Sequence, residues 1–191
     1  MMIRYQALAV SFVLLSALVS PRVEAASLEL SPATAVLAVG DQIEILIYGT
    51  DFIDGTDGGD FSLGWTANLA YVGFTIVDPP WDVSSFDDSN AAGGIVDAID
   101  VFSVFDTPGV GGGAFEIARL RLTATAEGTG NVTLGLNLVG WSLAGDSLEY
   151  SLGSEAQLEI LPIPEPGTAI LLGLALGLLA SVRRDPRRDE S

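Results

Sequence analysis

The chain lacks three residue types on which much enzyme chemistry depends: its 191 residues include no cysteine, no histidine and no lysine. Without cysteine there is no disulfide and no thiol nucleophile. Without histidine and lysine there is no Ser-His-Asp triad, no histidine-bearing zinc site, no Schiff base and no phosphate-loop lysine. Carboxylates are the acid–base groups that remain. We therefore expect a protein that is not an enzyme.

Positive charge is almost absent from the middle of the chain. Residues 27–163 contain 20 acidic residues and two basic ones, Arg119 and Arg121. Such a segment cannot neutralise phosphates by counterion release, so we expect no binding to nucleic acid. The same repulsion disfavours docking on an anionic membrane surface. Strong negative charge favours solubility and the binding of divalent cations.

The N-terminal residues 1–25 have the pattern of a secretory signal peptide. Arg4 provides the positive start, residues 7–19 form the apolar region, and Ala25 closes a small-residue cleavage site. The alternative is a retained membrane anchor. The apolar region has about 13 residues, however, which is shorter than the roughly 20 of a spanning helix. We predict cleavage by a signal peptidase after Ala25.

The C-terminal end combines three features in a fixed order. Pro164, Glu165 and Pro166 precede an uncharged run of leucine, alanine and glycine at residues 167–182, and Arg183 and Arg184 follow. As a helix, the run would span roughly 24 Å, slightly less than the hydrocarbon core of a bilayer. We predict a single transmembrane helix. Basic residues stay cytoplasmic, so the rest of the chain would face outward.

This ordered combination resembles the PEP-CTERM sorting signal of Gram-negative bacteria, with residues 162–191 as the tail. The resemblance implies recognition by an exosortase, a membrane cysteine protease thought to cut near the motif during export. Such bacteria often secrete extracellular polysaccharide. Pro164, Glu165 and Pro166 would be the recognition residues. The protein would be anchored in the inner membrane before processing, and then periplasmic, at the outer surface or extracellular. The alternative is an ordinary C-terminal anchor.

Short β-favouring runs with period-2 alternation recur through the middle of the chain. Glycine-rich turn clusters separate them, and no segment has the pattern of an amphipathic helix of ordinary length. The runs are residues 42–47, 61–65, 69–77, 118–124, 132–138 and 157–160, and the turn clusters are residues 54–60, 109–113 and 127–130. We predict an all-β domain over residues 26–161, folded as a β-sandwich whose two sheets bury each other's apolar faces.

The order of these runs resembles that of cohesin domains. Residues 39–45 are similar to the opening Gly-Asp strand of that family, residues 61–76 to its "Phe-x-Leu-x-Tyr-Asp-Pro" hairpin, and residues 117–134 to its late strand pair. Thr66 and Ala67 stand at the usual Asp-Pro positions, which weakens the assignment of dockerins as partners. The resemblance implies a jelly-roll β-sandwich that binds proteins.

Two sets of charged residues are candidate sites. Asp54, Asp57 and Asp60 recur at every third position of a glycine-rich loop, and flexible carboxylates of this kind suit calcium. The spacing is not that of an EF-hand, and the alternative is a solvated acidic loop. Arg119 and Arg121 share the outward face of one strand. They could contact an acidic partner, or pair with carboxylates on neighbouring strands.

The tryptophans suggest a second function. Trp65, Trp81 and Trp141 could stack on sugar rings, although the alternation around Trp65 indicates the core. Trp81, in a Pro-Pro-Trp-Asp loop, is the best candidate for exposure. Our first hypothesis is a non-catalytic, surface-displayed cohesin-like module that contacts an unknown protein or the matrix. The alternatives are a carbohydrate-binding module for the secreted polysaccharide, and glycoside hydrolysis by two carboxylates about 5–10 Å apart.

Overall fold

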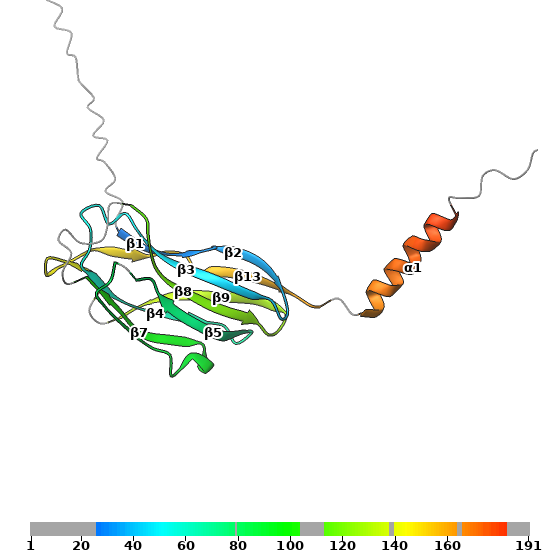
Figure 1. The fold of residues 1–191 in the computed structure, drawn as a ribbon, viewed down its shortest axis with the longest axis horizontal. Helices are drawn as coiled ribbons and strands as arrows, with labels where there is room; N and C mark the ends of the chain where they lie inside the picture. Colours follow the sequence, from blue (N-terminus) through cyan, green and yellow to red (C-terminus); the bar gives the residue numbers. More distant parts are fainter. Residues whose placement is uncertain (1–25, 79, 104–112, 138–139, 164–165, 183–191) are drawn as a thin grey trace, which may run out of the picture.

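The computed structural model describes residues 26–78, 80–103, 113–137, 140–163 and 166–182. They form a two-sheet β-sandwich followed by a single helix that lies apart from it (Figure 1). The signal peptide with its cleavage residue Ala25, the motif residues Pro164 and Glu165, and the basic pair Arg183 and Arg184 lie outside the described residues.

The first sheet has five strands in the order β12-β1-β3-β8-β5. They are β12 (Tyr150–Leu152), β1 (Ala26–Ser31), β3 (Gln42–Thr50), β8 (Phe115–Ala124) and β5 (Leu69–Ile76). The β1–β12 pair is parallel and the other pairs are antiparallel. The edges of this sheet are therefore β12 and β5.

The second sheet has eight strands, with β11-β10-β4-β9-β13-β2 as its main path and β7 and β6 attached beside β4. They are β11 (Asp146–Ser147), β10 (Ser142–Leu143), β4 (Gly58–Trp65), β9 (Gly128–Leu136), β13 (Ala156–Leu161), β2 (Thr34–Ala38), β7 (Ile95–Phe102) and β6 (Val83–Asp87). A short 3-10 helix, η1 (Ala91–Gly93), precedes β7. The β13–β2 pair is parallel.

The first strands of the chain tie the two sheets together. β1 pairs with β3 in the first sheet, whereas β2, only two residues later, pairs with β13 in the second. Ala26 lies at the end of the sandwich where β3 finishes, and Leu161 lies beside Ala38 at the opposite end. The chain therefore enters the sandwich at one end and leaves it toward the C-terminal helix at the other (Figure 1).

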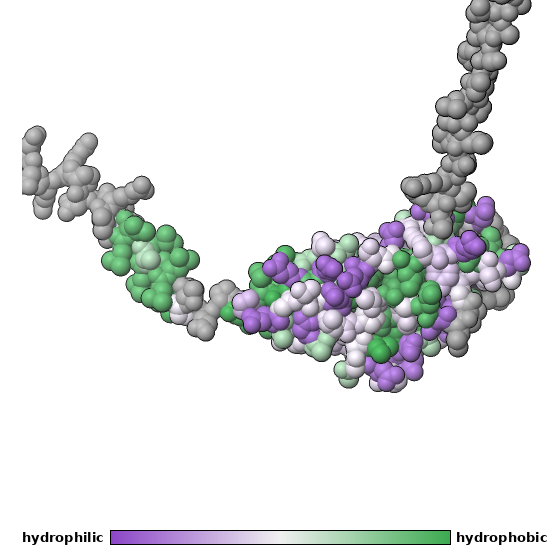
Figure 2. Space-filling view, turned by 180° about the vertical axis from the view of Figure 1, so that it is seen from behind, coloured by the Kyte–Doolittle hydropathy of each residue, from purple (hydrophilic) through white to green (hydrophobic). Residues whose placement is uncertain are grey.

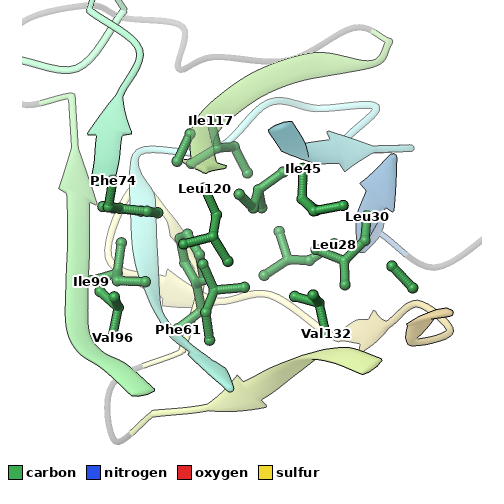
Figure 3. Close-up of a cluster of buried hydrophobic side chains, with 14 of the residues drawn as sticks. Leu28, Leu30, Ile45, Phe61, Phe74, Val96, Ile99, Ile117, Leu120 and Val132 are labelled. Atoms are coloured by element: carbon green, nitrogen blue, oxygen red, sulfur yellow. The ribbon is translucent and has the colours of Figure 1, made fainter. Parts of the chain in front are cut away.

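The core lies between the two sheets and follows the alternation predicted from the sequence (Figure 3). In β3 and β8, Ile45, Ile47, Leu120 and Leu122 have no exposed surface. Phe61 and the inward residues of β9 and β13 close the core from the other sheet. Each large aliphatic side chain buried in this way contributes about 1.5–3 kcal/mol, so period-2 hydrophobicity is the main determinant of the fold.

The boundaries of two strands differ from the sequence expectation. The cluster at residues 54–60 was expected to be a loop, but β4 begins within it at Gly58. Likewise β9 begins at Gly128, inside the turn expected at residues 127–130. Glycine usually marks the turns between strands, which explains both errors. Here glycine occupies strand positions where another chain segment approaches closely, as at Gly59 beside Trp141.

The C-terminal helix α1 (Pro166–Val182) begins with proline, which suits the first turn because its missing N–H has no helical partner there. Its 17 residues would rise roughly 25 Å. The large side chains described on it are all exposed, and most of the helix surface seen in Figure 2 is apolar. Among the residues described, no helix is both long and apolar enough to cross a membrane. The membrane segment at residues 167–182 stays a prediction.

Candidate functional site

The outer face of the first sheet displays the two arginines of the β domain. β8 lies between β3 and β5, and its inward residues fill the core, so its alternate residues point outward. Arg119 lies opposite Leu46 of β3 and Thr75 of β5, and Arg121 lies opposite Glu44 and a glycine. Both arginines are exposed. β8, which lies next to the edge strand β5, therefore presents two cations on the outer face of the sheet.

A β-bulge gives Arg119 a carboxylate partner. The register between β3 and β8 shifts between Ile47 and Tyr48, so β8 contains an extra residue. Glu116 and Arg119, three positions apart, pair on the surface through the Arg119 Nε and Glu116 Oε1 atoms. The hydrogen bond to Glu116 raises the pKa of Arg119. Arg119 thus pairs with a carboxylate of its own strand and not with one on a neighbouring strand. Strict alternation could not have identified Glu116 as the partner.

Arg121 lies over a position without a side chain. A Cβ built on Gly73 would be 3.3 Å from the Nη2 atom of Arg121, so the guanidinium covers this glycine of β5. Glu44 lies directly opposite on β3. The face around Arg121 therefore carries charges of both signs, and the glycine opposite Arg121 adds no side chain to it. Contact with an acidic partner at Arg119 and Arg121 stays a prediction.

The polar side chains around the start of β4 have a structural role. Thr56 donates a hydrogen bond to the carbonyl of Ser142 at 2.8 Å and accepts one from the Gly58 N–H at 3.0 Å. Asp60, only 4% exposed, accepts a hydrogen bond from the Gly140 N–H at 2.6 Å. Asp57 accepts one from the backbone of residue 144. These side chains hold residues 140–144 against the start of β4.

The same geometry bears on the predicted calcium site. Within the described residues, no group of three or more acidic side chains is arranged to hold a metal ion. Asp54 is exposed, while the carboxylates of Asp57 and Asp60 are directed to backbone N–H groups. The arrangement does not support Asp54, Asp57 and Asp60 as a ligand set, because calcium requires several converging oxygens.

We expect Asp60→Ala to lower the free energy of unfolding by about 1–3 kcal/mol, because it leaves the part-buried Gly140 N–H without this acceptor. Asp60→Asn retains an acceptor oxygen and should recover part of this loss. Urea denaturation in EDTA measures both variants. The exposed Asp54→Ala is the matched control and should be nearly neutral.

Repeating the melts of the parent and of Asp57→Asn/Asp60→Asn with millimolar calcium tests the metal directly. A ligand that binds only the folded state raises the midpoint. A rise in the parent that the double variant loses would restore the calcium hypothesis.

The expectation that Trp81 is exposed is wrong. Trp81 and Trp141 are only 3% and 1% exposed, and they pack with Phe52 and Phe115 at the end of the sandwich where β3 finishes. The ring centroids lie 5.2 Å apart for Phe52–Trp141 and 6.1 Å apart for Trp81–Trp141. The segment from Pro80 to Asp82 turns its tryptophan inward. Neither Trp81 nor Trp141 offers a face to a sugar ring.

Trp65 is half-buried against the core, in agreement with its strand alternation. It stacks on Tyr71, with ring centroids 5.9 Å apart and planes inclined by 15°. Burial raises the pKa of Tyr71, and its hydroxyl donates a hydrogen bond to Asp88 at 3.0 Å, which raises the pKa further. The aromatic pair packs against the core, and the hydrogen bond to Asp88 holds the Tyr71 ring in place.

The sorting tail follows the sandwich almost directly. β13 ends at Leu161 and α1 begins at Pro166, and only Pro162 and Ile163 separate the last strand from the Pro-Glu-Pro motif. Residues 162–188 match the family model of the PEP-CTERM protein-sorting motif. No curated relative matches the chain by sequence.

The β-sandwich is similar to solved structures of cohesins. The seventh type I cohesin of ScaB from Pseudobacteroides cellulosolvens matches with a TM-score of 0.59 and 14% identity, covering 74% of this chain and 96% of the cohesin. The OlpA cohesin of Clostridium thermocellum, solved in a cohesin–dockerin complex, matches with 0.59 and 12%, covering 72% and 99%. A non-cellulosomal cohesin from the archaeon Archaeoglobus fulgidus matches with 0.52 and 12%, covering 77% and 97%.

At these identities the likeness shows the fold alone. The β domain is a cohesin-like β-sandwich. The chain therefore carries a PEP-CTERM sorting motif directly behind a domain with the cohesin-like fold.

Proposed function

We propose that this chain is a non-catalytic cell-envelope protein that displays a cohesin-like binding module and is sorted by an exosortase-type enzyme. The observation that carries the proposal is the sorting motif at residues 162–188, placed immediately after the last strand of the sandwich. A sorting signal implies export, and the proposed signal peptide at residues 1–25 agrees with it. The folded module would then be the part that reaches the envelope or the exterior.

Binding is the activity that the domain's chemistry supports. The chain has no histidine, cysteine or lysine, and Asp57 and Asp60 are used to hold backbone. The OlpA cohesin is found in complex with a dockerin. By analogy of fold we propose protein binding for this domain, with the β8 face around Arg119 and Arg121 as the contact surface. Two cations within a domain of strongly negative charge would select an acidic patch on the partner.

Location and matrix association complete the proposal. We propose that α1 holds the precursor in the inner membrane, slightly short of the full bilayer thickness, with Arg183 and Arg184 on the cytoplasmic side. Processing would release the module to the periplasm, outer surface or exterior, where it would associate with secreted polysaccharide through its partner. Direct sugar binding is less favoured, because Trp81 and Trp141 are buried.

We expect Arg119→Gln with Arg121→Gln to leave the fold intact and to reduce capture of an envelope partner about tenfold. Exposed ion pairs contribute at most about 1 kcal/mol to stability, so the melting midpoint should change little. The loss of two interfacial charges weakens association more strongly. Affinity capture from envelope extract, quantified by mass spectrometry, measures the effect.

The matched control is Ser85→Glu with Thr133→Glu, which changes the net charge equally on the second sheet. Equal capture by both double variants would leave the β8 face without a role. Hydrolysis of envelope polysaccharide by the purified chain, abolished by substitution of one particular carboxylate, would contradict the proposal that the protein is not an enzyme.

A further inference from the structure

β2 is an edge strand with one unpaired side. Among the described strands it pairs with β13 alone, in an unbroken parallel register from Thr34 to Ala38. The Gln157 N–H donates to the carbonyl of Ala33, and the Val39 N–H donates to the carbonyl of Leu161. Because backbone direction alternates along a strand, the odd-numbered residues of β2 face β13. The N–H and C=O groups of Thr34 and Val36 therefore point to the free edge.

A side chain caps the backbone at one end of this edge, and the middle of the edge is accessible to a further strand. The Ala38 N–H, which also points away from β13, donates to the Oδ2 atom of Asp41 at 2.8 Å. Thr34 is exposed, and Val36 is 63% exposed, among the most exposed large hydrophobic residues of the sandwich. Two residues thus offer an uncapped set of donors and acceptors beside an apolar side chain. This is the arrangement to which an extended peptide adds as a further strand.

The other described edge strands are less suited to strand addition. The pairing of β5 is broken by a register shift between Tyr71 and Gly73, and that of β6 by one between Ser85 and Asp87. Bulges of this kind twist an edge away from further pairing. β11 and β12 have only two and three residues. β2 is the edge with five residues in regular register.

The outer face beside β2 is hollowed and carries a carboxylate. A groove of about 530 Å³ crosses β2, β13 and β9, and its lining includes Thr34, Val36, Gln157 and Glu159. Val36, Glu159 and Thr129 lie in one row across the three strands. A strand added to β2 would lie about 4.8 Å from it. A long cationic side chain from that strand could lay its aliphatic part over Val36 and bring its charge to Glu159.

We propose that β2 is a docking edge for an extended basic peptide segment of another protein. The occupant is basic because the surrounding domain is strongly acidic and Glu159 lines the groove. A second copy of this chain would bring the same negative charge against itself. The inference goes beyond the proposed function, since it concerns the second sheet and is independent of Arg119, Arg121 and the sorting motif.

The test uses the purified full chain and a fluorescent synthetic ten-residue peptide of alternating valine and arginine. Fluorescence anisotropy at physiological ionic strength should show binding. The same peptide with every amide N-methylated keeps its charge but has no N–H group on either strand edge, and should bind about tenfold more weakly. A peptide of alternating valine and glutamate should not bind. Equal binding of the methylated peptide would reduce the effect to charge attraction and overturn the proposal.

Variants locate the site. Val36→Pro removes the outward N–H but none of the hydrogen bonds to β13, and should weaken binding about tenfold, whereas Val36→Thr keeps the N–H and should bind like the parent. Glu159→Gln should weaken binding, and Glu44→Gln, the same change on the first sheet, should not. Parent-like binding by Val36→Pro or by Glu159→Gln would contradict the assignment.

Amide exchange provides a readout that does not depend on how well the proline variant folds. Bound Val-Arg peptide should slow exchange at Thr34 and Val36, and leave Ala38, already bonded to Asp41, unchanged. Protection confined to other strands would overturn the proposal. Sedimentation of the chain without peptide completes the test, because a dimer abolished by Val36→Pro would assign this edge to self-association.

Discussion

Replacing Pro164, Glu165 and Pro166 together with alanine should make the uncleaved precursor accumulate in the membrane fraction. The three residues lie inside the matched sorting motif, and the apolar run that follows is left intact. Membrane insertion depends on that run, whereas recognition by the processing enzyme would depend on the motif. Immunoblotting of membrane and released fractions with an antibody against the β domain measures the ratio of the two forms.

The control variant carries alanine at Pro162 and Ile163, which lie within the matched range but before Pro-Glu-Pro. It changes the same short segment but keeps Pro-Glu-Pro, so processing should continue. Unchanged release from the motif variant would leave residues 162–188 as a simple anchor. Loss of processing in both variants would instead show that the whole segment between β13 and the apolar run is required, and not Pro-Glu-Pro alone.

The short segment between the end of β13 and Pro-Glu-Pro has a structural consequence for processing. β13 is held on both sides, by β9 and by β2, up to Leu161. The motif therefore begins three residues beyond a fixed strand, on the end of the sandwich that also carries the turns before β3 and β9. An enzyme acting at the motif would meet this folded end directly. The exposed groups there, including Asp41 and Glu127, would lie beside the membrane surface in the anchored precursor.

Most of the fold followed from hydrophobic alternation. Ile45 and Ile47 of β3, and Leu120 and Leu122 of β8, were expected on one face and are fully buried. This pattern is reliable because a one-residue slip would turn every one of these side chains toward solvent. It decides which residues point inward, but it does not decide which strands are neighbours. The latter came from the resemblance to cohesins, and the fold agrees with it.

The errors arose where local sequence has more than one structural use. The exposed position expected for Trp81 was based on its prolines, but an aromatic cluster with Phe115 and Trp141 draws the ring inward. The partner of Arg119 depends on a bulge, which alternation alone does not reveal. Asp60 accepts a hydrogen bond from the backbone of Gly140, 80 residues away in the sequence, and its assignment as a calcium ligand stays a prediction. Such long-range contacts leave no local signal.

The two glycines at the start of β4 also have more than one possible structural use. Their substitution should have the largest effect on the free energy of unfolding. Gly58 has φ +129°, and a Cβ there would lie 1.9 Å from the carbonyl oxygen of Val101. A Cβ on Gly59 would lie 2.5 Å from Cγ of Trp141. Both contacts are far inside van der Waals distance. These glycines were mistaken for loop residues because close backbone approach and turn formation both require glycine.

We expect Gly58→Ala to be the most destabilising of the single substitutions considered, lowering the free energy of unfolding by about 3 kcal/mol or more. Steric overlap with a backbone carbonyl cannot be relieved by a side-chain rotation, and the left-handed φ adds strain. Gly59→Ala should cost about 1–3 kcal/mol, because part of its clash is with the Trp141 ring. Urea denaturation of the purified variants measures both values.

Substitutions at two further glycines separate the cost of steric overlap from that of backbone strain. A double variant identifies the side chain that causes the overlap at Gly59. Gly93→Ala has open space and should be nearly neutral, while Gly40→Ala, with φ +98° and nothing within 4 Å, should show the backbone strain alone, about 1–2 kcal/mol. Trp141→Leu should reduce the cost of Gly59→Ala, because it removes the ring that the new methyl group meets, and should not reduce that of Gly58→Ala. If Gly58→Ala cost no more than Gly40→Ala, the close packing of β4 against β7 would be wrong, because strain without overlap would then account for the whole effect.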